Sequence, residues 1–237
     1  MSNRIQKTAD SMRQKDGTDR ASGSLRRNTT SHILDAAEKV FSCHGFSGAR
    51  IDEIARVCEL PKANVLYYFS TKEKLYQATL ERFLDGWLAD ADVWISEKHS
   101  PYEGLLKYVQ AKIVFSRRKP EVSRLFMQEL LSGGGQIEDF LSITLKEHVE
   151  RLSHVFKVWQ ERGEMKAVNV PHFMFMLWSM TQSYADMQVQ FAAVLGRKKL
   201  IKSDFDDGLQ TIMQLLSSVC TDAGTSVPEA DRTPAPR

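Results

Sequence analysis

The chain has 237 residues, of which 42% are hydrophobic and 26% charged, and its net charge is +2. This is an ordinary globular composition, and a chain of this length forms one or two domains with cores of their own. The sequence contains no run of about 18 apolar residues and no apolar N-terminal signal segment. We therefore expect no membrane span and no export, and we expect a cytoplasmic protein.

The first 27 residues form a basic arm without aromatic side chains. They carry seven basic and three acidic residues, a charge of +4, so the remainder of the chain carries −2. Rich in Ser, Gly and Thr, this arm is predicted to be disordered and to contact DNA phosphates, or to be a solvated tail without a role. Arg26 and Arg27 are candidate phosphate contacts, because they precede a predicted helix whose N-terminus also favours an anion.

Residues 51–75 carry the most informative pattern. Ile51, Ile54, Ala55 and Cys58 recur at helical spacing and predict a helix over 52–59. Pro61 suits a first helical position, so a second helix of only two turns is predicted over 62–68.

The short second helix presents side chains that fit a DNA major groove. A cation and phenols suit phosphates, an amide suits base edges, and a small residue permits close approach. These outward residues are Lys62, Ala63, Asn64, Tyr67 and Tyr68. Ser70 and Glu73 then form an S-x-x-E box, which predicts the start of the next helix.

The rest of the chain is predicted to be helical, with breaks at Pro or Gly. No strand pattern occurs, so the fold class is all-α, with about nine helices. The predicted helices cover 28–45, 52–59, 62–68, 72–97, 102–118, 120–132, 137–162, 171–195 and 204–222.

This pattern predicts four segments: a disordered arm (1–27), a three-helix DNA-binding domain (28–75), a helical bundle for ligand binding and dimerisation (76–222) and a disordered tail (223–237). Helix 72–97 belongs to both domains. We expect a shift at one of its ends to move the other, as a ligand-controlled switch requires.

Helix 171–195 carries Trp178, Gln182 and Asp186 at i, i+4 and i+8, in one column. An aromatic ring, an amide and a carboxylate suit a flat polar heterocycle, which stacks on the ring and pairs with the polar groups. The same column also fits ordinary packing, with both polar groups bonded to neighbouring helices or to a dimer partner.

A short recognition helix binds specifically when two copies read two half-sites, so a homodimer is expected. Helices 171–195 and 204–222 are its predicted interface. The predicted seam consists of Leu200, Ile201, Phe205, Leu209, Ile212, Met213, Leu216 and Val219. Their spacing fits packing within one chain equally well.

Catalytic and metal-binding patterns are missing from the sequence. It has no nucleophile elbow, phosphate loop, H-E-x-x-H or paired acid motif, so we expect no enzyme and no cofactor. Cys43, His44 and Cys58 match no standard zinc spacing, and Cys58 falls on an apolar face, which favours core packing over a metal site.

The helix-turn-helix segment resembles the TetR-type transcriptional regulators. The matching residues are Phe41, Gly45, Phe46, Ile54, Ala55, Tyr68, Phe69, Thr71, Lys72, Glu73 and Leu75. Pro61 and Leu66 stand where this family usually has Ser and Tyr. The resemblance implies a regulator that binds double-stranded operator DNA. The candidate DNA contacts are Arg26, Arg27, Thr30, Arg50, Lys62, Ala63, Asn64, Tyr67, Tyr68 and Lys72.

Residues 30–196 are similar to the pyrimidine-utilisation repressors within that family. The similarity is clearest over 64–76, 85–88, 123–131 and 175–186, with Met180 in place of a smaller residue. It implies a repressor of pyrimidine and nitrogen metabolism that binds uracil or thymine between two tryptophans, with a glutamine reading the ring edge. The implied ligand contacts are Trp87, Trp178 and Gln182, followed by Tyr184, Asp186, Arg124 and Phe126.

Two other functions fit parts of the pattern. A TetR-type repressor that senses a hydrophobic compound needs a pocket of aliphatic and aromatic residues only. An architectural DNA-binding protein needs no ligand and shows no sequence-specific operator.

Overall fold

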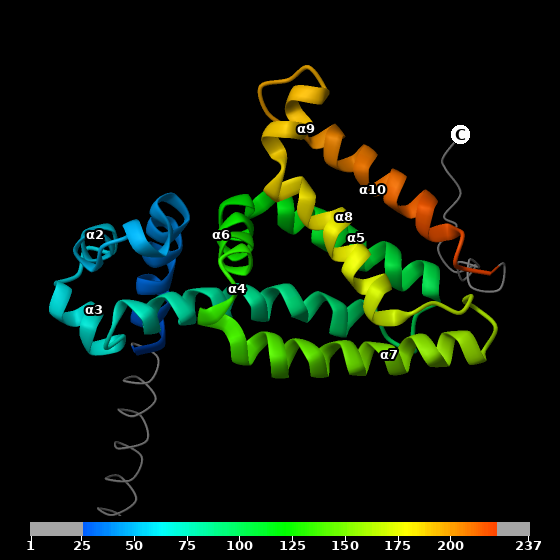
Figure 1. Cartoon of the computed structure of the whole chain (residues 1–237), viewed down its shortest axis with the longest axis horizontal. Coiled ribbons are helices and arrows are strands. Elements are labelled where there is room, and N and C mark those ends of the chain that lie inside the picture. Colours follow the sequence, from blue (N-terminus) through cyan, green and yellow to red (C-terminus); the bar gives the residue numbers. More distant parts are fainter. Residues whose placement is uncertain (1–25, 222–237) are drawn as a thin grey trace, which may run out of the picture. The chain divides into compact units, whose positions relative to one another are not determined.

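A computed structural model describes residues 26–221, and these are helical apart from turns and one isolated bridge between Met165 and Cys220 (Figure 1). The predicted all-α fold is confirmed. Most of the predicted arm (1–27) and the predicted tail (223–237) lie outside the described residues. The chain divides into two compact units between Thr79 and Leu80. Within residues 26–221, no helix has both the length and the apolar character needed to cross a membrane.

The first unit is built from a helix over 26–48, α2 (Ile51–Val57), α3 (Lys62–Tyr68) and the first turns of α4 (Lys72–Trp94). Its core contains Phe41 and Tyr76, whose rings meet edge to face with centroids 4.9 Å apart. Cys58 is buried in this core, as its position on the apolar face predicted, whereas Cys43 is exposed. The short helices α2 and α3 pack on each other, so the outer face of α3 remains open to solvent.

Helix α4 begins at Lys72 as predicted, but its capping residue differs from the prediction by one position. Thr71 lies directly before the helix, and its Oγ1 accepts a hydrogen bond from the backbone N–H of Lys74 (3.2 Å). The capping residue is therefore Thr71 rather than Ser70. Glu73 keeps a role in this first turn: its pKa is lowered by a hydrogen bond from its own backbone N–H and by the Thr71 hydroxyl.

The turn between α2 and α3 contains a strained residue. Glu59 has a φ of +52°, in the left-handed region that disfavours residues with a Cβ. We expect Glu59→Gly to be more stable than Glu59→Ala by about 1 kcal/mol, because only Gly adopts this backbone without strain. Urea unfolding of both variants measures the difference, and equal midpoints would contradict it.

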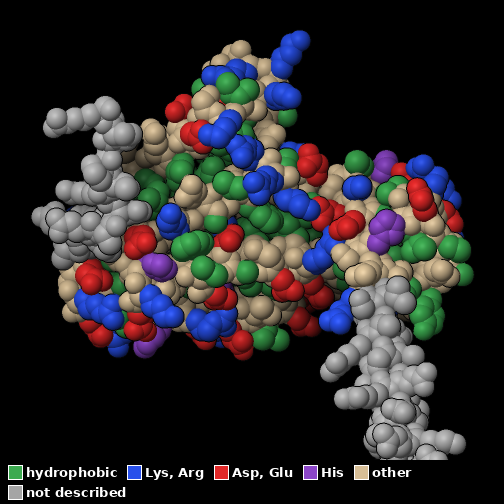
Figure 2. Space-filling view, turned by 180° about the vertical axis from the view of Figure 1, so that it is seen from behind, with side chains coloured by type: hydrophobic (Ala, Val, Ile, Leu, Met, Phe, Trp, Pro, Cys, Tyr) green, Lys and Arg blue, Asp and Glu red, His purple; other side chains and the backbone are tan. Residues whose placement is uncertain are grey.

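The second unit is a helical bundle. Its helices are the remainder of α4, α5 (Pro101–Arg118), α6 (Pro120–Leu131), α7 (Lys146–Glu161), α8 (Val170–Asp186), α9 (Gln188–Val194) and α10 (Lys202–Ser217). Helix α8 packs against α5, α6 and α7, and α10 packs against α5. Trp159 and Phe156 of α7 are fully buried in the core. The α9–α10 connection forms a basic tip with Arg197, Lys198 and Lys199 exposed (Figure 2).

Two predicted helices are interrupted. The segment 137–162 begins with a 3₁₀ turn (Gly135–Ile137) and a π-helical stretch (Phe140–Leu145) before α7. The segment 171–195 divides at Met187 into α8 and α9. No Gly or Pro marks this second break. In a continuous helix the carbonyl oxygen of Ala185 would accept a hydrogen bond from the backbone N–H four residues later. Here it accepts a hydrogen bond from the guanidinium of Arg124 on α6 (3.2 Å).

Most of the predicted dimer seam packs inside the chain. Leu200, Phe205, Ile212, Met213 and Leu216 are buried, and Ile201 is exposed. Other apolar side chains of these helices face solvent instead, among them Phe175, Met176, Val189, Val194, Leu195 and Leu215. The exposed apolar face of α8, α9 and α10 is therefore made by different residues from those that the spacing suggested.

Candidate functional site

The outward face of α3 is a candidate nucleic-acid interface. Val65 is the residue that this helix buries, whereas Ala63 and Asn64 are exposed. Lys62 is also exposed, and its Nζ forms an ion pair with Asp52 of α2 (3.0 Å). Such a surface pair is weak, so a phosphate competes with it readily.

The two tyrosines at the end of α3 occupy different environments. Tyr67 is 75% exposed, and Tyr68 is half-buried. Their rings meet edge to face with centroids 5.5 Å apart. Tyr67 is therefore the more available of the two for a contact outside the protein, while Tyr68 also packs within the unit.

Lys72 has a structural role within the first unit. Its Nζ donates to the backbone carbonyls of Ala49 (3.1 Å) and Ser47 (3.4 Å) and lies over the ring of Phe46. The ammonium thus ties α4 to the turn before α2. Of the other predicted DNA contacts, Arg26, Arg27 and Arg50 are exposed and Thr30 is half-buried.

The second unit contains an aromatic cluster that includes both predicted ligand-binding tryptophans. Trp87 of α4 and Trp178 of α8 have ring centroids 5.1 Å apart. Phe126 of α6 lies 6.5 Å from Trp87, and the Trp178 Nε1 donates to the hydroxyl of buried Tyr108 (2.9 Å). The structure therefore brings Trp87, Trp178 and Phe126 together in one cluster.

Gln182 lies one turn after Trp178 and is 9% exposed. Its Nε2 is buried and makes no hydrogen bond of standard geometry with the described protein atoms, although the amide lies close enough to the Asp186 carboxylate to lower the pKa of that group. A buried amide without a partner is destabilising, because it loses its bonds to water and gains none. This nitrogen is therefore a buried donor without a well-formed hydrogen bond in the interior of the bundle.

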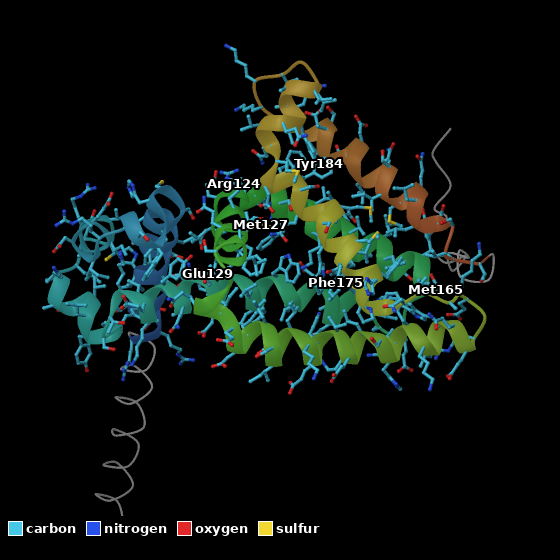
Figure 3. All side chains as sticks on the ribbon, viewed as in Figure 1. Arg124, Met127, Glu129, Met165, Phe175 and Tyr184 are labelled. Carbon is cyan, nitrogen blue, oxygen red and sulfur yellow. The ribbon has the colours of Figure 1, made fainter. Side chains whose placement is uncertain are left out.

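Asp186 ends the column and faces α6. Its carboxylate accepts a hydrogen bond from the Ser123 hydroxyl (3.0 Å). Burial raises the pKa of Asp186, and the Ser123 hydroxyl, the Arg124 guanidinium and the nearby Gln182 amide partly oppose this. Figure 3 shows Arg124 on α6 beside the C-terminal end of α8. Asp186 and Arg124 thus link two helices.

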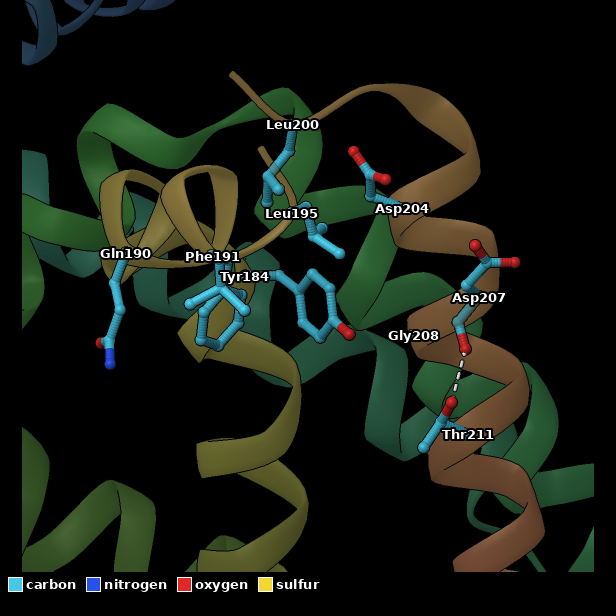
Figure 4. A pocket seen from close by; sticks show the side chains of 10 residues that line it. Tyr184, Gln190, Phe191, Leu195, Leu200, Asp204, Asp207, Gly208 and Thr211 are labelled. Atoms are coloured by element: carbon cyan, nitrogen blue, oxygen red, sulfur yellow. Dashed lines mark hydrogen bonds between the residues drawn. The ribbon is translucent and has the colours of Figure 1, made fainter. Parts of the chain in front are cut away.

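Tyr184 points away from the tryptophan pair. Its ring packs on Phe191 and Phe205, and it lines a groove of about 400 Å³ between α8, α9 and α10 (Figure 4). Trp87, Trp178 and Gln182 are not part of this groove. The predicted ligand contacts therefore fall into two places.

The tryptophan rings contact each other directly. Centroids 5.1 Å apart are within the usual range for packed aromatic pairs. A planar ligand between them would have to separate the rings.

Lys112 joins this cluster and was not among the residues predicted from the sequence. It is 2% exposed, and its Nζ donates to the carbonyl of Trp87, lies 3.6 Å from Asp90 and sits over the Trp87 ring. A sequence signal existed, because Lys112 follows Tyr108 and precedes Ser116 at i±4 on the buried face of α5. A lysine at an apolar position of a helix is unusual and marks a polar interior.

Burial lowers the pKa of Lys112 to about 8, although the Asp90 carboxylate opposes this change. Between about pH 8 and the ordinary lysine value of 10.5, the unfolded chain binds a proton that the folded chain has released. The stability of the parent therefore rises with pH in this window. Below it, the buried charge is fully destabilising.

We expect Lys112→Met to be more stable than the parent at pH 7, by on the order of 1 kcal/mol, because it removes a buried charge. The advantage should shrink as the pH rises from 8 to 10. Urea unfolding at both ends of this range measures it. A variant less stable than the parent at pH 7 would contradict the expectation.

Comparisons with known proteins agree with this architecture. Residues 33–79 match the bacterial regulatory proteins of the tetR family, and residues 80–223 match the C-terminal region of YcdC-like proteins. The HTH-type transcriptional regulator RutR of Escherichia coli K12 is 35% identical over 184 residues, which cover 78% of this chain and 86% of RutR. The HTH-type transcriptional repressor SCO4008 of Streptomyces coelicolor is 28% identical, covering 64% of this chain and 76% of its own.

A solved structure shares the fold. The crystal structure of AibR in complex with isovaleryl coenzyme A and operator DNA has a TM-score of 0.60 at 18% identity and covers 79% of this chain and 97% of AibR. The two family matches together span the described residues from 33 onward. The relatives are regulators rather than enzymes. The chain therefore belongs to the TetR family of DNA-binding bacterial transcriptional regulators.

Proposed function

We propose that this protein is a repressor whose operator binding is controlled by uracil, thymine or a closely related pyrimidine. We further propose that it regulates genes of pyrimidine and nitrogen metabolism. The observation that carries the proposal is the buried Gln182 Nε2, which lacks a partner and lies one turn from the Trp87–Trp178 pair.

The chemistry of these three side chains suits a pyrimidine. Indole rings stack on the face of a flat heterocycle, and a glutamine amide both donates to and accepts from an imide edge. A ligand that bonded Gln182 Nε2 would remove the penalty of the unpartnered donor. The resemblance to the pyrimidine-utilisation repressors, over most of the chain, supports the same ligand class.

A homodimer is part of this proposal, with α8, α9 and α10 as its interface. Val189 is 87% exposed, and Met176, Val194 and Leu215 are also largely exposed. Apolar side chains exposed together on neighbouring helices favour burial against a partner. Two-fold symmetry would then present two copies of α3 to two half-sites of an operator.

A sensor of hydrophobic compounds is the second candidate. The observation that favours it is the groove between α8, α9 and α10, because Phe191, Val194, Leu195 and Leu200 make much of its lining apolar. This groove is formed partly by the exposed apolar side chains assigned to the dimer interface, so a partner would cover it. The proposed pyrimidine site, formed by Trp87, Trp178 and Gln182, lies outside this groove and so does not compete with the dimer interface for it.

Ligand screening by thermal unfolding tests the two candidates directly. A ligand at 100 times its dissociation constant stabilises a protein by about 2.7 kcal/mol. We expect uracil or thymine to raise the unfolding temperature and to change operator binding in a mobility-shift titration. Stabilisation by acyl compounds, with no effect of any pyrimidine, would favour the hydrophobic sensor.

We expect Asn64→Ala to weaken operator binding by about 1–3 kcal/mol and to relax the preference at one base position, because Asn64 is exposed on α3 and its amide suits a base edge. Lys62→Ala should instead weaken binding to all sequences and reduce its salt dependence. Mobility-shift titrations with operator and random DNA separate these effects. Equal losses on both DNAs for Asn64→Ala would contradict base reading.

A further inference from the structure

The Lys112 ammonium lies against the Trp87 ring, one of the two indoles of the tryptophan pair. Its Nζ is 4.7 Å from the centroid of the Trp87 ring and 5.2 Å from that of Tyr108. Trp87 contacts Trp178, and Tyr108 accepts the hydrogen bond from the Trp178 indole. One cation therefore lies against both residues that surround and orient Trp178.

The Lys112 ammonium has two polar contacts and two ring contacts among the described residues. An ammonium group has three N–H donors. The Trp87 carbonyl accepts one of them, and the Asp90 carboxylate, which is partly exposed, lies 3.6 Å away. Among the described residues, His148 and its partner Asp92 are the other titratable groups whose charges bear on this region.

Stability gives no reason for a lysine at this position. Burial of an ammonium is unfavourable, and its pKa falls to about 8 in spite of Asp90. Methionine would fill a similar volume without this penalty. A function in binding explains why a cation occupies the buried face of α5.

We propose that Lys112 is an effector-binding residue whose ammonium group donates a hydrogen bond to a carbonyl oxygen of the ligand. This inference rests on the proposed function. With Gln182 Nε2, the site then offers two donors from two helices, α5 and α8. Two buried donors select a ring that carries oxo groups, such as uracil or thymine, over an aminopyrimidine such as cytosine, which presents a donor in place of one oxygen.

Calorimetric titration of uracil, 2-thiouracil and 4-thiouracil into the full-length protein tests the pairing. Sulfur is a weaker acceptor than oxygen, and each analogue replaces one of the two oxygens. We expect the parent to bind both analogues about tenfold more weakly than uracil, because Lys112 and Gln182 each donate to one oxygen. The analogue whose disadvantage disappears in Lys112→Met identifies the oxygen that Lys112 contacts.

Lys112→Met should weaken uracil binding about 10- to 100-fold, because the ligand loses one hydrogen bond to a charged group. It should also bind uracil and one of the two analogues alike, because the donor to that oxygen is gone, while the other analogue keeps its disadvantage. Lys107→Met, an exposed lysine of the same helix, is the matched control and should keep all three affinities. If Lys112→Met fails to fold, Lys112→Gln, which removes the charge, should reduce the same discrimination.

Two results overturn the assignment. One is uracil binding by Lys112→Met within about threefold of the parent. The other is an equal loss for uracil and both analogues, which indicates a role in packing alone. Binding of no pyrimidine by the parent is a different result: it removes the proposed function, and the assignment of Lys112 with it.

Discussion

Gln182→Leu is expected to abolish the response to uracil while leaving operator affinity nearly unchanged. Leucine keeps the volume of the side chain but cannot pair with an imide edge. The buried ligand groups would then lack partners, at about 1–3 kcal/mol for each, or roughly 5- to 150-fold in affinity. Gln182 lies in the second unit, whereas the candidate DNA contacts lie in the first.

The chain offers a matched control for this change. Gln160 of α7 also has a buried Nε2 without a hydrogen-bond partner among the described atoms. Gln160→Leu makes the same chemical change outside the tryptophan cluster and should bind uracil like the parent. Calorimetric titration of uracil into both variants measures the two affinities. Uracil binding by Gln182→Leu as tight as that of the parent would refute the pocket assignment and favour the hydrophobic sensor.

Trp87→Ala should remove uracil binding and also destabilise the second unit by about 3–5 kcal/mol. The ring is buried, packs on Trp178 and Phe126, and lies beneath the Lys112 ammonium. Its loss would take away a stacking surface and leave a cavity. Loss of binding alone would therefore not separate a ligand contact from a structural one.

Trp159→Ala is the control that distinguishes a ligand contact of Trp87 from a structural role. Trp159 is fully buried in the same unit, packs on Phe156, and donates its indole N–H to the carbonyl of His99. We expect a similar loss of stability with uracil binding retained, measured at a temperature where circular dichroism shows both variants folded. If both variants lose uracil equally, Trp87 acts only through the fold.

The sequence by itself determined the elements whose ends depend on local chemistry. Helix α3 covers Lys62–Tyr68 as predicted, because Pro61 fixes the backbone at its start. Pro101 and Pro120 are themselves the first residues of α5 and α6, whereas Pro61 lies one position before α3, as its N-cap, and not at the predicted first helical position. The apolar spacing around Ile54 and Cys58 predicted the core side of α2, since helical periodicity assigns a face without knowledge of the partner.

The candidate site could be predicted only in part. Spacing along one helix placed Trp178 and Gln182 in a column, and the resemblance to a known subfamily added Trp87 from a distant segment. Neither revealed that the two indoles touch, that Tyr184 turns toward α10, or that Gln182 Nε2 lacks a partner. Each of these facts depends on how separate helices pack.

Tertiary structure alone decided the remaining features. The break at Met187 has no Gly or Pro in the sequence, and it coincides with the hydrogen bond from Arg124 to the Ala185 carbonyl, a partner some 60 residues away. Lys112 is buried because α4 supplies the Trp87 carbonyl, the Trp87 ring and Asp90. Helical periodicity gives the direction of a side chain relative to its own helix, but burial and hydrogen bonding are set by the neighbouring helix, which only the folded chain brings into contact.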